Sequence, residues 1–455
     1  MSRSPSFWLD QLGPRPRRPA LSGDAEADVC IVGGGYTGLW TAYELKRADP
    51  SLVVVVLEAE QVGFGASGRN GGWVVGKLSG SRSAWRARGG PDGPRAMVRA
   101  IQQTVAEIGT VVARENIECD WQQDGTLIVA QSDTQLARLR AEAADERNEL
   151  GADLAPQVLD ADALAARVRV GGGTGALFSP HCARVQPARL VDGLASAAER
   201  AGVVIHEGTP VKTMRSGLAM TRGGDVRARY VLRATEGYTA DLPGEHRALL
   251  PMNSSMIITE PLGDAVWSQV GWAGAETLLD GSYVYTYSQR TADGRIAIGG
   301  RGVPYRFGSR TDREGPVPRR TVNELRESLR SLFPVLDEVR VERAWHGILG
   351  VSRDWCPAVG LDPLSGLGYA GGYAGQGVAA SNLAGRTLRD LVLGRDTDLT
   401  RLPWVGKPAR DWEPEPLRYV ATHTVYSLYR MADRQERDRG RESPVAAIAD
   451  RIAGR

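Results

Sequence analysis

The feature that most constrains this chain is a glycine-rich turn between two apolar runs near the N-terminus. The turn is Gly33-Gly34-Gly35-Tyr36-Thr37-Gly38, which fits the pattern G-x-G-x-x-G. The apolar run 28–32 precedes it, a stretch with helical spacing follows it, and the second apolar run, 52–57, shows no polar alternation. Residues 28–58 therefore predict a strand, a turn, a helix and a second strand, which together form a nucleotide-binding βαβ unit.

Each glycine of this pattern suits a dinucleotide. Gly33 permits the tight turn, Gly35 lets the backbone approach a pyrophosphate above the helix N-terminus, and Gly38 allows close packing of helix on strand. Glu58 follows Gly38 by 20 residues, at the end of the second strand, where a carboxylate can accept hydrogen bonds from ribose hydroxyls. A carboxylate there favours NAD or FAD and disfavours the 2′-phosphate of NADP.

Length and composition exclude several other classes of protein. The 455 residues suggest two or three domains, and a formal net charge of +2 gives no basic footprint for nucleic acid. The four cysteines show no paired spacing, which favours a reduced, cytoplasmic setting. The apolar runs are too short to span a membrane, and the five histidines lack the spacing of a metal site. We therefore expect neither a membrane partner nor a bound metal.

Beyond residue 58, helical and strand-like patterns alternate. Alternating apolar runs between residues 230 and 301 predict an antiparallel sheet. The glycine cluster 171–175 is interpreted as a plain loop, because no helical pattern or ribose acid follows it. Helices are expected at 94–118, 133–150, 188–201, 321–332 and 378–393, and strands at 126–130, 203–206 and 211–214.

These patterns predict an α/β fold with a separate β-rich part. A Rossmann-type domain built from discontinuous segments carries an inserted antiparallel-sheet substrate domain and a C-terminal helical tail. The expected nucleotide-binding segments are 1–93, 151–229 and 341–400; the expected substrate segments are 94–150 and 230–340; the C-terminal extension is 401–455.

A second glycine-rich stretch carries a family resemblance. Residues 63–72, GFGASGRNGG, resemble the D-amino-acid-oxidase-like family of FAD-dependent oxidoreductases, and within it the γ-glutamylputrescine oxidase type of subgroup. Other motifs similar to that family follow in the same order along nearly the whole chain, up to about residue 400. They are TPV at 209–211, ATEGY at 234–238, WHGILGVSRDWCPAVG at 345–360 and GGYAGQGV at 371–378.

The resemblance implies FAD as the cofactor. It places residues 66–72 along the pyrophosphate and the ring system, Val211 beside the adenine, and residues 371–378 at the flavin N1–C2=O edge. Relatives with covalent flavin place a cysteine near Gly347, whereas Cys356 lies beyond Asp354, so noncovalent FAD is expected. The cofactor-binding residues expected in total are Gly33, Gly35, Tyr36, Thr37, Gly38, Glu58, Ala59, Ala66, Ser67, Arg69, Asn70, Gly71, Gly72, Val211, Gly237, Gly372, Tyr373, Gly375, Gln376, Gly377 and Val378.

Departures from the family pattern bear on the substrate. Glycine-oxidase-like relatives clamp the substrate carboxylate with an arginine at a position that corresponds to Leu349 in this chain. This favours amines over α-amino acids, with Arg301 and Arg353 as alternative anion partners. Gln376 stands where many relatives carry histidine. The side chains that could line a substrate pocket are Trp73, Tyr283, Tyr285, Arg301, Trp345 and Tyr373.

The resemblance thus implies an FAD-dependent enzyme that acts on CH–NH or CH–NH2 groups. A hydride would pass from the amine C–H to flavin N5, and the resulting imine would be hydrolysed to an aldehyde and ammonia or a smaller amine. Molecular oxygen, which would yield H2O2, or another acceptor would take the electrons. Two alternatives stay open: an amino-acid or aminophosphonate oxidase, and a noncatalytic flavin subunit whose residues 404–455 dock a partner. The sequence identifies no catalytic residue and fixes neither the individual amine nor the oligomeric state.

Overall fold

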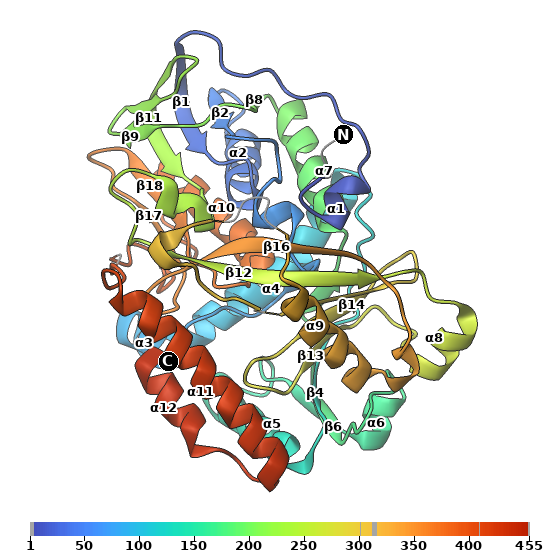
Figure 1. Cartoon of the computed structure of the whole chain (residues 1–455). Helices are drawn as coiled ribbons and strands as arrows, with labels where there is room; N and C mark the ends of the chain where they lie inside the picture. The colour runs from blue at the N-terminus through green and yellow to red at the C-terminus, as the bar shows by residue number, and fades with distance from the viewer. Residues whose placement is uncertain (1–3, 301, 312–315, 409, 454–455) are drawn as a thin grey trace.

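A largely parallel sheet forms the upper part of the molecule in Figure 1. The computed structural model describes residues 4–300, 302–311, 316–408 and 410–453. Strands β1 and β2 lie side by side at the centre of this sheet, as the βαβ pattern predicts. The order across the sheet is β17 (Ala358–Leu361), β18 (Leu367–Gly371), β11 (Asp225–Arg233), β1 (Ala25–Val32), β2 (Val54–Leu57) and β8 (Val204–His206), with β9 (Thr213–Arg215) and β10 (Leu218–Met220) beside β11.

Both faces of this sheet are covered around β2 and the second half of β1, which explains the lack of polar alternation in these two stretches. On one face, Val29 and Ile31 pack among α2 (Tyr36–Ala48), α7 (Pro187–Arg200) and α10 (Gly377–Val392). On the other face, Cys30 and Val32 pack against residues of β10 and β11. This face-by-face division follows from the two-residue period of a strand.

Helices α2 and α10 cross at very close range. A Cβ atom on Gly385 would lie 2.8–2.9 Å from atoms of Trp40 and Thr41, so α10 needs a glycine at the crossing point. An ion pair between Arg389 and Glu44, 2.9 Å long, joins the same two helices further along. Because of this contact, the N-terminal ends of two helices that are far apart in the sequence are held near one another.

The second sheet lies below the first in Figure 1 and is almost entirely antiparallel. Its longest pairing joins β12 to β16 over ten register positions, with a bulge at Ile258/Thr259. One pair, β4 with β13, is parallel. The order across the sheet is β16 (Val341–Val351), β12 (Leu250–Thr259), β15 (Ile296–Gly300), β14 (Tyr287–Arg290), β13 (Thr277–Asp280), β4 (Thr126–Ala130), β6 (Gly175–Ser179) and β5 (Gln157–Asp160).

Three strands pair outside the segment to which the sequence assigned them. Strands β5 and β6 lie within the predicted nucleotide segment 151–229, and β16 begins the predicted segment 341–400, yet all three belong to the second sheet. Their membership depends on hydrogen bonds to β4 and β12, which are distant in the sequence and leave no local signal. We therefore propose a domain division in which these three strands move to the substrate domain.

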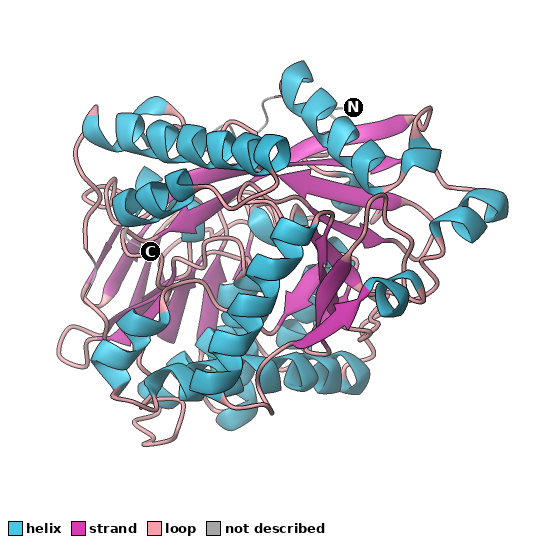
Figure 2. Ribbon diagram, turned by 90° about the horizontal axis from the view of Figure 1, so that it is seen from below, coloured by secondary structure: helices cyan, strands magenta, loops and turns pink. Residues whose placement is uncertain are grey.

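Helices enclose both sheets, as the view from below in Figure 2 shows. The short helix α1 (Phe7–Asp10) packs on α7 and β16, and β3 (Trp73–Val75) pairs with β7 (Cys182–Arg184) as a two-stranded ribbon. The other helices are α3 (Arg82–Gly89), α4 (Gly93–Arg114), α5 (Asp133–Leu150), α6 (Ala161–Ala165), α8 (Asp264–Val270) and α9 (Arg319–Leu332), with short 3₁₀ turns η1 (Ala66–Gly68), η2 (Glu236–Asp241), η3 (Phe307–Ser309) and η4 (Pro334–Leu336).

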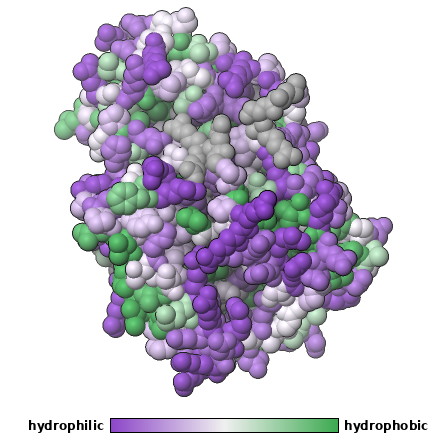
Figure 3. Space-filling view, viewed as in Figure 1, coloured by the Kyte–Doolittle hydropathy of each residue, from purple (hydrophilic) through white to green (hydrophobic). Residues whose placement is uncertain are grey.

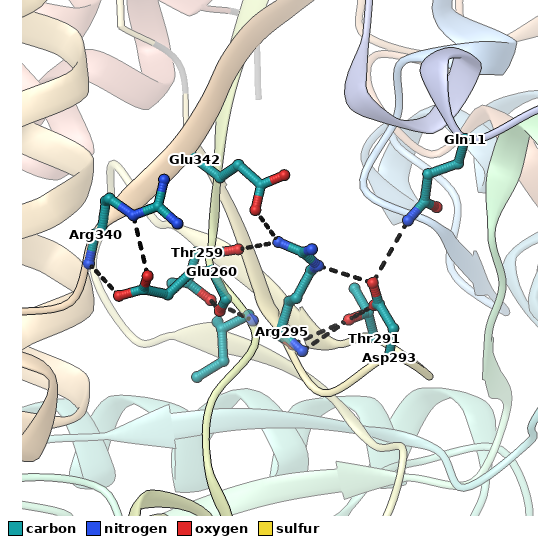
Figure 4. A network of polar contacts seen from close by, with 9 residues as sticks. Gln11, Thr259, Glu260, Thr291, Asp293, Arg295, Arg340 and Glu342 are labelled. Carbon is teal, nitrogen blue, oxygen red and sulfur yellow. Dashed lines mark hydrogen bonds and ion pairs between the residues drawn. The ribbon is translucent and has the colours of Figure 1, made fainter. Parts of the chain in front are cut away.

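A polar network ties the edge of the second sheet together (Figure 4). Arg295 at the start of β15 donates to Asp293 at 2.7 Å and to the Thr259 carbonyl at 3.0 Å, and it also pairs with Glu342 of β16. These bonds link β12, β15 and β16 where their ladders end. They belong to the scaffold and lie away from the glycine-rich loops.

The C-terminal extension forms two helices, α11 (Leu417–Arg439) and α12 (Pro444–Ala453), which pack against one another. They lie at the lower left of Figure 1, and hydrophobic residues gather in the same part of Figure 3 among hydrophilic ones. No helix among the residues described is long and apolar enough to cross a membrane.

Candidate active site

Two glycine-rich regions that are far apart in the sequence face one cavity of about 810 Å³. The first is formed by the turn 33–38 together with the loop 66–72, and the second is the loop 371–378. This volume is within the range of small-molecule and cofactor sites. Residues of the second sheet close the cavity on its other side. The predicted cofactor residues that line it are Gly33, Gly35, Tyr36, Thr37, Glu58, Ala59, Ala66, Ser67, Arg69, Asn70, Gly71, Val211, Tyr373, Gly375, Gln376, Gly377 and Val378.

The N-terminus of α2 opens onto this cavity. Its N-cap residue is Gly35, which has no side chain to cap the helix. The Tyr36 N–H donates to the Ser67 hydroxyl at 2.9 Å, and a Cβ atom on Gly35 would lie 2.9 Å from that same oxygen. Gly33 adopts a φ of +116°, and a Cβ atom there would lie 2.5 Å from the Ala234 carbonyl oxygen. The turn therefore presents backbone N–H groups with no side-chain bulk above them.

Glu58 directly follows β2, and its carboxylate holds the glycine-rich turn 33–38 in place. Its carboxylate accepts hydrogen bonds from the Gly34 N–H at 2.7 Å and from the Glu60 N–H at 2.9 Å. Burial raises the pKa of the Glu58 carboxyl to about 7, although both backbone bonds act in the opposite direction. Because Glu58 and Val211 line the same cavity, the carboxylate can reach a ribose beside the predicted adenine position.

The loop 66–72 is braced by its own side chains. Asn70 donates to the carbonyls of Ala66 and Ser67 at 3.1 and 2.8 Å and accepts from the Gly72 N–H at 2.8 Å. Arg69 is only 2% exposed, and its guanidinium lies 4.4 Å from the centre of the Phe64 ring. Both side chains hold the loop in shape, which leaves its backbone available along the cavity wall.

The glycine-rich loop 371–378 reaches the cavity at the N-terminus of α10. Its N-cap residue is Gln376, whose side chain makes no capping hydrogen bond. The Gln376 Oε1 atom is buried and has no hydrogen-bond partner among the residues described. Tyr373 connects this loop to the first one, because its hydroxyl lies 3.0 Å from Thr37 Oγ1. The two helix N-termini therefore belong to one polar surface.

Glu236, which the sequence analysis did not select, holds the second loop in place. Its carboxylate accepts from the Gly350 N–H at 2.7 Å and from the Tyr373 N–H at 3.0 Å. Its φ of +44° is uncommon for a residue other than glycine, and burial raises the pKa of its carboxyl to about 7. The sequence does carry a signal for Glu236. Within the motif ATEGY it is the single acidic residue, and it stands beside Gly237 between two apolar strands.

Four predicted cofactor residues do not line the cavity. Gly38 and Gly237 serve close packing: a Cβ atom on Gly38 would lie 2.0 Å from the Gly33 carbonyl oxygen, and one on Gly237 would lie 2.8 Å from Ile348. Gly72 and Gly372 have φ values of +71° and +79° and shape the loops from behind. Their contribution is to backbone geometry, and the sequence pattern cannot separate this from ligand contact.

The part of the cavity between loop 66–72 and the second sheet is aromatic. Trp73 and Tyr287 meet edge to face with ring centres 6.0 Å apart, and the Tyr287 hydroxyl lies 2.8 Å from Ser254 Oγ. Ile348 and Leu349 line the same cavity, so the side chain for which a comparison with an arginine clamp was predicted is an apolar part of this wall. We call this region, defined by Trp73, Ser254, Tyr287, Ile348 and Leu349, the inner end.

A charged region lies further from the glycine loops, which we call the outer end. It is lined by Lys77, Arg138, Glu142, Ser282 and Tyr285. Lys77 and Glu142 face each other at 3.5 Å and are about half exposed, and the Glu142 carboxylate raises the pKa of the Lys77 ammonium. Lys77 follows Trp73 by four residues, and an extended chain spans at most about 3.6 Å per residue, so their Cα atoms lie at most about 14 Å apart.

Three of the predicted substrate-pocket residues line the cavity, namely Trp73, Tyr285 and Tyr373. Trp345 does not, because it packs on Phe7 and Trp8 and donates to the Arg69 carbonyl at 2.9 Å. Strand β16 turns the indole towards the N-terminal helix, a face that the sequence cannot specify without the register.

Tyr283 is likewise absent from the cavity wall, since its ring stacks on Tyr429 of α11. Arg353 is paired with Glu413 at 2.9 Å. Arg301 lies outside the residues described. Within those residues, no group of three or more His, Cys, Asp or Glu side chains is placed to hold a metal ion.

The cavity suits a dinucleotide by its donor set. Two helix N-termini without side-chain caps face it with N–H groups of the kind that bind phosphate or an electron-rich ring edge, Glu58 adds a carboxylate of the kind that binds ribose hydroxyls, and glycines keep side chains out of the space between them. The buried Gln376 Oε1 atom, without a partner in the described chain, is a further polar group that a ligand could satisfy. The residues present fit FAD.

Comparison with known proteins agrees with this site. Residues 28–391 match the family of FAD dependent oxidoreductases known as DAO. The chain belongs to this family. It is therefore an FAD-dependent oxidoreductase, as the motifs predicted. The match begins at β1 and ends at the last turn of α10, so it includes both glycine-rich loops.

Individual relatives cover most of this FAD-dependent oxidoreductase. It is 33% identical over 387 residues to gamma-glutamylputrescine oxidoreductase of Escherichia coli, with 82% of this chain and 85% of that protein covered. It is 29% identical over 439 residues to the probable oxidoreductase OrdL of Haemophilus influenzae, with 94% and 97% covered. The structure of glycine oxidase from Geobacillus kaustophilus aligns with a TM-score of 0.68 at 22% identity, with 82% of this chain and 96% of that one covered. The predicted fold class is thereby confirmed.

Proposed function

We propose that this enzyme oxidises the C–N bond of a primary or secondary amine and releases an aldehyde together with ammonia or a smaller amine. The observation that supports the proposal is the inner end of the cavity, whose wall is formed by Leu349 and two aromatic rings and includes no arginine among the residues that define it. An α-amino acid would leave its carboxylate without a bidentate partner there. An amine without a carboxylate beside the reacting nitrogen needs no such partner at this end.

FAD, when bound, accepts the hydrogen and two electrons that leave the substrate C–H bond. The imine that remains takes up water to give the aldehyde and the free amine. The electrons then pass to oxygen, which becomes H2O2, or to another acceptor. We propose that the residues that line the glycine-rich side of the cavity hold FAD without a covalent bond, since none of the four cysteines lines the cavity.

The side chains of the inner end favour the neutral form of the amine and orient its nitrogen. Trp73, Tyr287 and Leu349 give this end of the cavity an apolar and aromatic wall, and the poor solvation of a charge beside such a wall lowers the pKa of a substrate ammonium. The neutral amine is the form whose lone pair assists hydride loss. The hydroxyl pair formed by Tyr287 and Ser254 can hydrogen-bond the substrate nitrogen and orient it.

The outer end suggests an elongated substrate. Lys77 and Glu142 form a loose pair with one cationic and one anionic group, each with unused hydrogen-bonding capacity, and both line the same cavity as Trp73. A linear amine whose far end carries a dipolar or acidic group suits a cavity with these two ends. Gamma-glutamylputrescine, which the name of one relative specifies, has this form, and we propose it as the first substrate to test.

The test is reduction of the bound flavin without oxygen, followed by its absorbance. We expect gamma-glutamylputrescine to bleach the flavin faster than putrescine, glycine or D-alanine, and oxygen uptake then shows whether oxygen is the acceptor. Faster bleaching by glycine or D-alanine would favour the amino-acid oxidase. No bleaching by any of them, with a second chain co-purifying in equal amount, would favour a noncatalytic flavin subunit. The free, buried thiols also support the proposal of a cytoplasmic location.

A further inference from the structure

The loop between β13 and β14 forms part of the outer end of the cavity. Asp280 fixes the two ends of this loop, because its carboxylate accepts from the Ser282 N–H at 2.9 Å and from the Thr286 N–H at 2.8 Å. The middle of the loop, Tyr283 and Val284, has no such internal support. Four residues of this segment line the cavity, namely Asp280, Gly281, Ser282 and Tyr285.

The middle of the loop is held by the C-terminal extension instead. Asp433 on α11 accepts from the Tyr283 N–H at 2.7 Å through one carboxylate oxygen and from the Val284 N–H at 3.1 Å through the other. Both oxygens of one carboxylate are thus used on two consecutive backbone groups. Hydrogen bonds to a charged acceptor are stronger than neutral ones, so this contact fixes the backbone of the loop tip.

The Tyr283 side chain strengthens the same contact. Its ring stacks on Tyr429 with centres 6.3 Å apart and an angle of 11° between the planes. The Arg138 guanidinium, from α5, lies 4.4 Å from the centre of the Tyr283 ring and pairs with Glu436 of α11 at 3.4 Å. These contacts keep Tyr283 against the C-terminal helices, while its neighbours Ser282 and Tyr285 line the cavity.

From these contacts we infer that α11 is a positioning element of the substrate site and that Asp433 is its positioning residue. By holding the backbone at 283–284, Asp433 sets where Tyr285 and Ser282 stand and therefore how far the cavity extends at its outer end. The family match ends at residue 391, so this element lies in a part of the chain beyond the region that matches the family. Asp433 itself does not line the cavity.

The first test measures amide hydrogen exchange on the FAD-loaded enzyme. Asp433→Ala should raise exchange in the peptide that contains Tyr283 and Val284 by about tenfold or more, because each hydrogen bond to a carboxylate shifts an opening equilibrium by roughly that factor. Asp438→Ala, an exposed aspartate on the same helix, is the matched control and should leave this exchange unchanged. Equal exchange in the parent and Asp433→Ala would overturn the inference.

The second test separates positioning from general destabilisation and rests on the proposed function. With gamma-glutamylputrescine as the probe, Asp433→Ala should raise KM by about tenfold and leave kcat within about twofold, whereas propylamine, too short to reach the outer end, should show an unchanged KM. Equal losses with both amines, or a change in flavin content, would assign Asp433 a structural role only. If neither amine reduces the flavin, the proposed function fails, and the exchange experiment still decides the inference.

The conservative variant guards against loss of the fold. Asp433→Asn keeps one good acceptor oxygen and should fall between the parent and Asp433→Ala in both exchange and KM. If Asp433→Ala does not fold, Asp433→Asn carries the test alone, and exchange equal to that of the parent contradicts the inference.

Discussion

Replacement of Gly35 by valine tests the nucleotide cradle most directly. Gly35 has a φ of −88°, which any residue can adopt, so the substitution causes no backbone strain. Its new Cβ atom would lie 2.9 Å from Ser67 Oγ, the acceptor of the Tyr36 N–H, and the rest of the side chain would enter the cavity. Overpacking of this kind costs about 1–3 kcal/mol, which corresponds to roughly a 5- to 150-fold loss of FAD affinity.

The assay is calorimetric titration of the apoprotein with FAD, together with the flavin-to-protein absorbance ratio after purification. Gly263→Val is the control, because a Cβ atom there meets nothing within 4 Å. The double variant Gly35→Val, Ser67→Gly removes the collision with the serine but leaves the valine above the helix N-terminus. We expect this double variant to bind FAD weakly as well. If Gly35→Val binds FAD as tightly as the parent, the assignment of the pyrophosphate position is refuted.

Four further predictions follow from the same structure. Burial raises the pKa of Glu58 to about 7, so the stability that this group contributes is present below its ordinary pKa and is lost as the pH rises through 7. The thermal midpoint of the apoprotein should therefore fall between pH 5 and pH 8 more in the parent than in Glu58→Gln. Lys77→Met should raise KM for gamma-glutamylputrescine and leave KM for propylamine unchanged; equal effects on both would argue against a subsite at the outer end. Trp345→Ala should lower the free energy of unfolding by about 3–5 kcal/mol, because the indole is 3% exposed, and flavin reduction at saturating amine should persist. Acid precipitation should release all of the yellow chromophore into the supernatant, and colour retained on the protein would contradict noncovalent binding.

The cofactor side of the cavity could be predicted in most of its residues. Gly33, Gly35 and Glu58 are close in the sequence, and their spacing alone specifies the turn and the acid at the strand end. Arg69 lines the cavity, and its guanidinium lies over the Phe64 ring, a contact that the sequence pattern does not specify. The role of Glu236 could not be predicted from the sequence, because its hydrogen-bond partners, Gly350 and Tyr373, are more than 100 residues away.

The substrate side was predicted less well. Trp345 and Tyr283 are aromatic residues near the right motifs, yet both face other elements. Tyr287, which stands at the inner end, belongs to the same run YVYTYS as Tyr283 and Tyr285. Strand β14 begins only at Tyr287, so the alternation expected across the whole run does not apply to its first half.

The sequence by itself determined the nucleotide half of this protein. A βαβ unit is a local structure whose hydrogen bonds, helix start and glycine turn lie within about 30 residues, so its chemistry can be followed along the chain. Only the tertiary structure decided which strands join the second sheet, which aromatic rings line the substrate cavity, and that a helix after residue 416 supports the loop 280–287. The physical reason is that strand pairing and register in the second sheet depend on partners as far apart in the sequence as Thr126 and Thr277, and a shift of one residue turns each side chain to the opposite face.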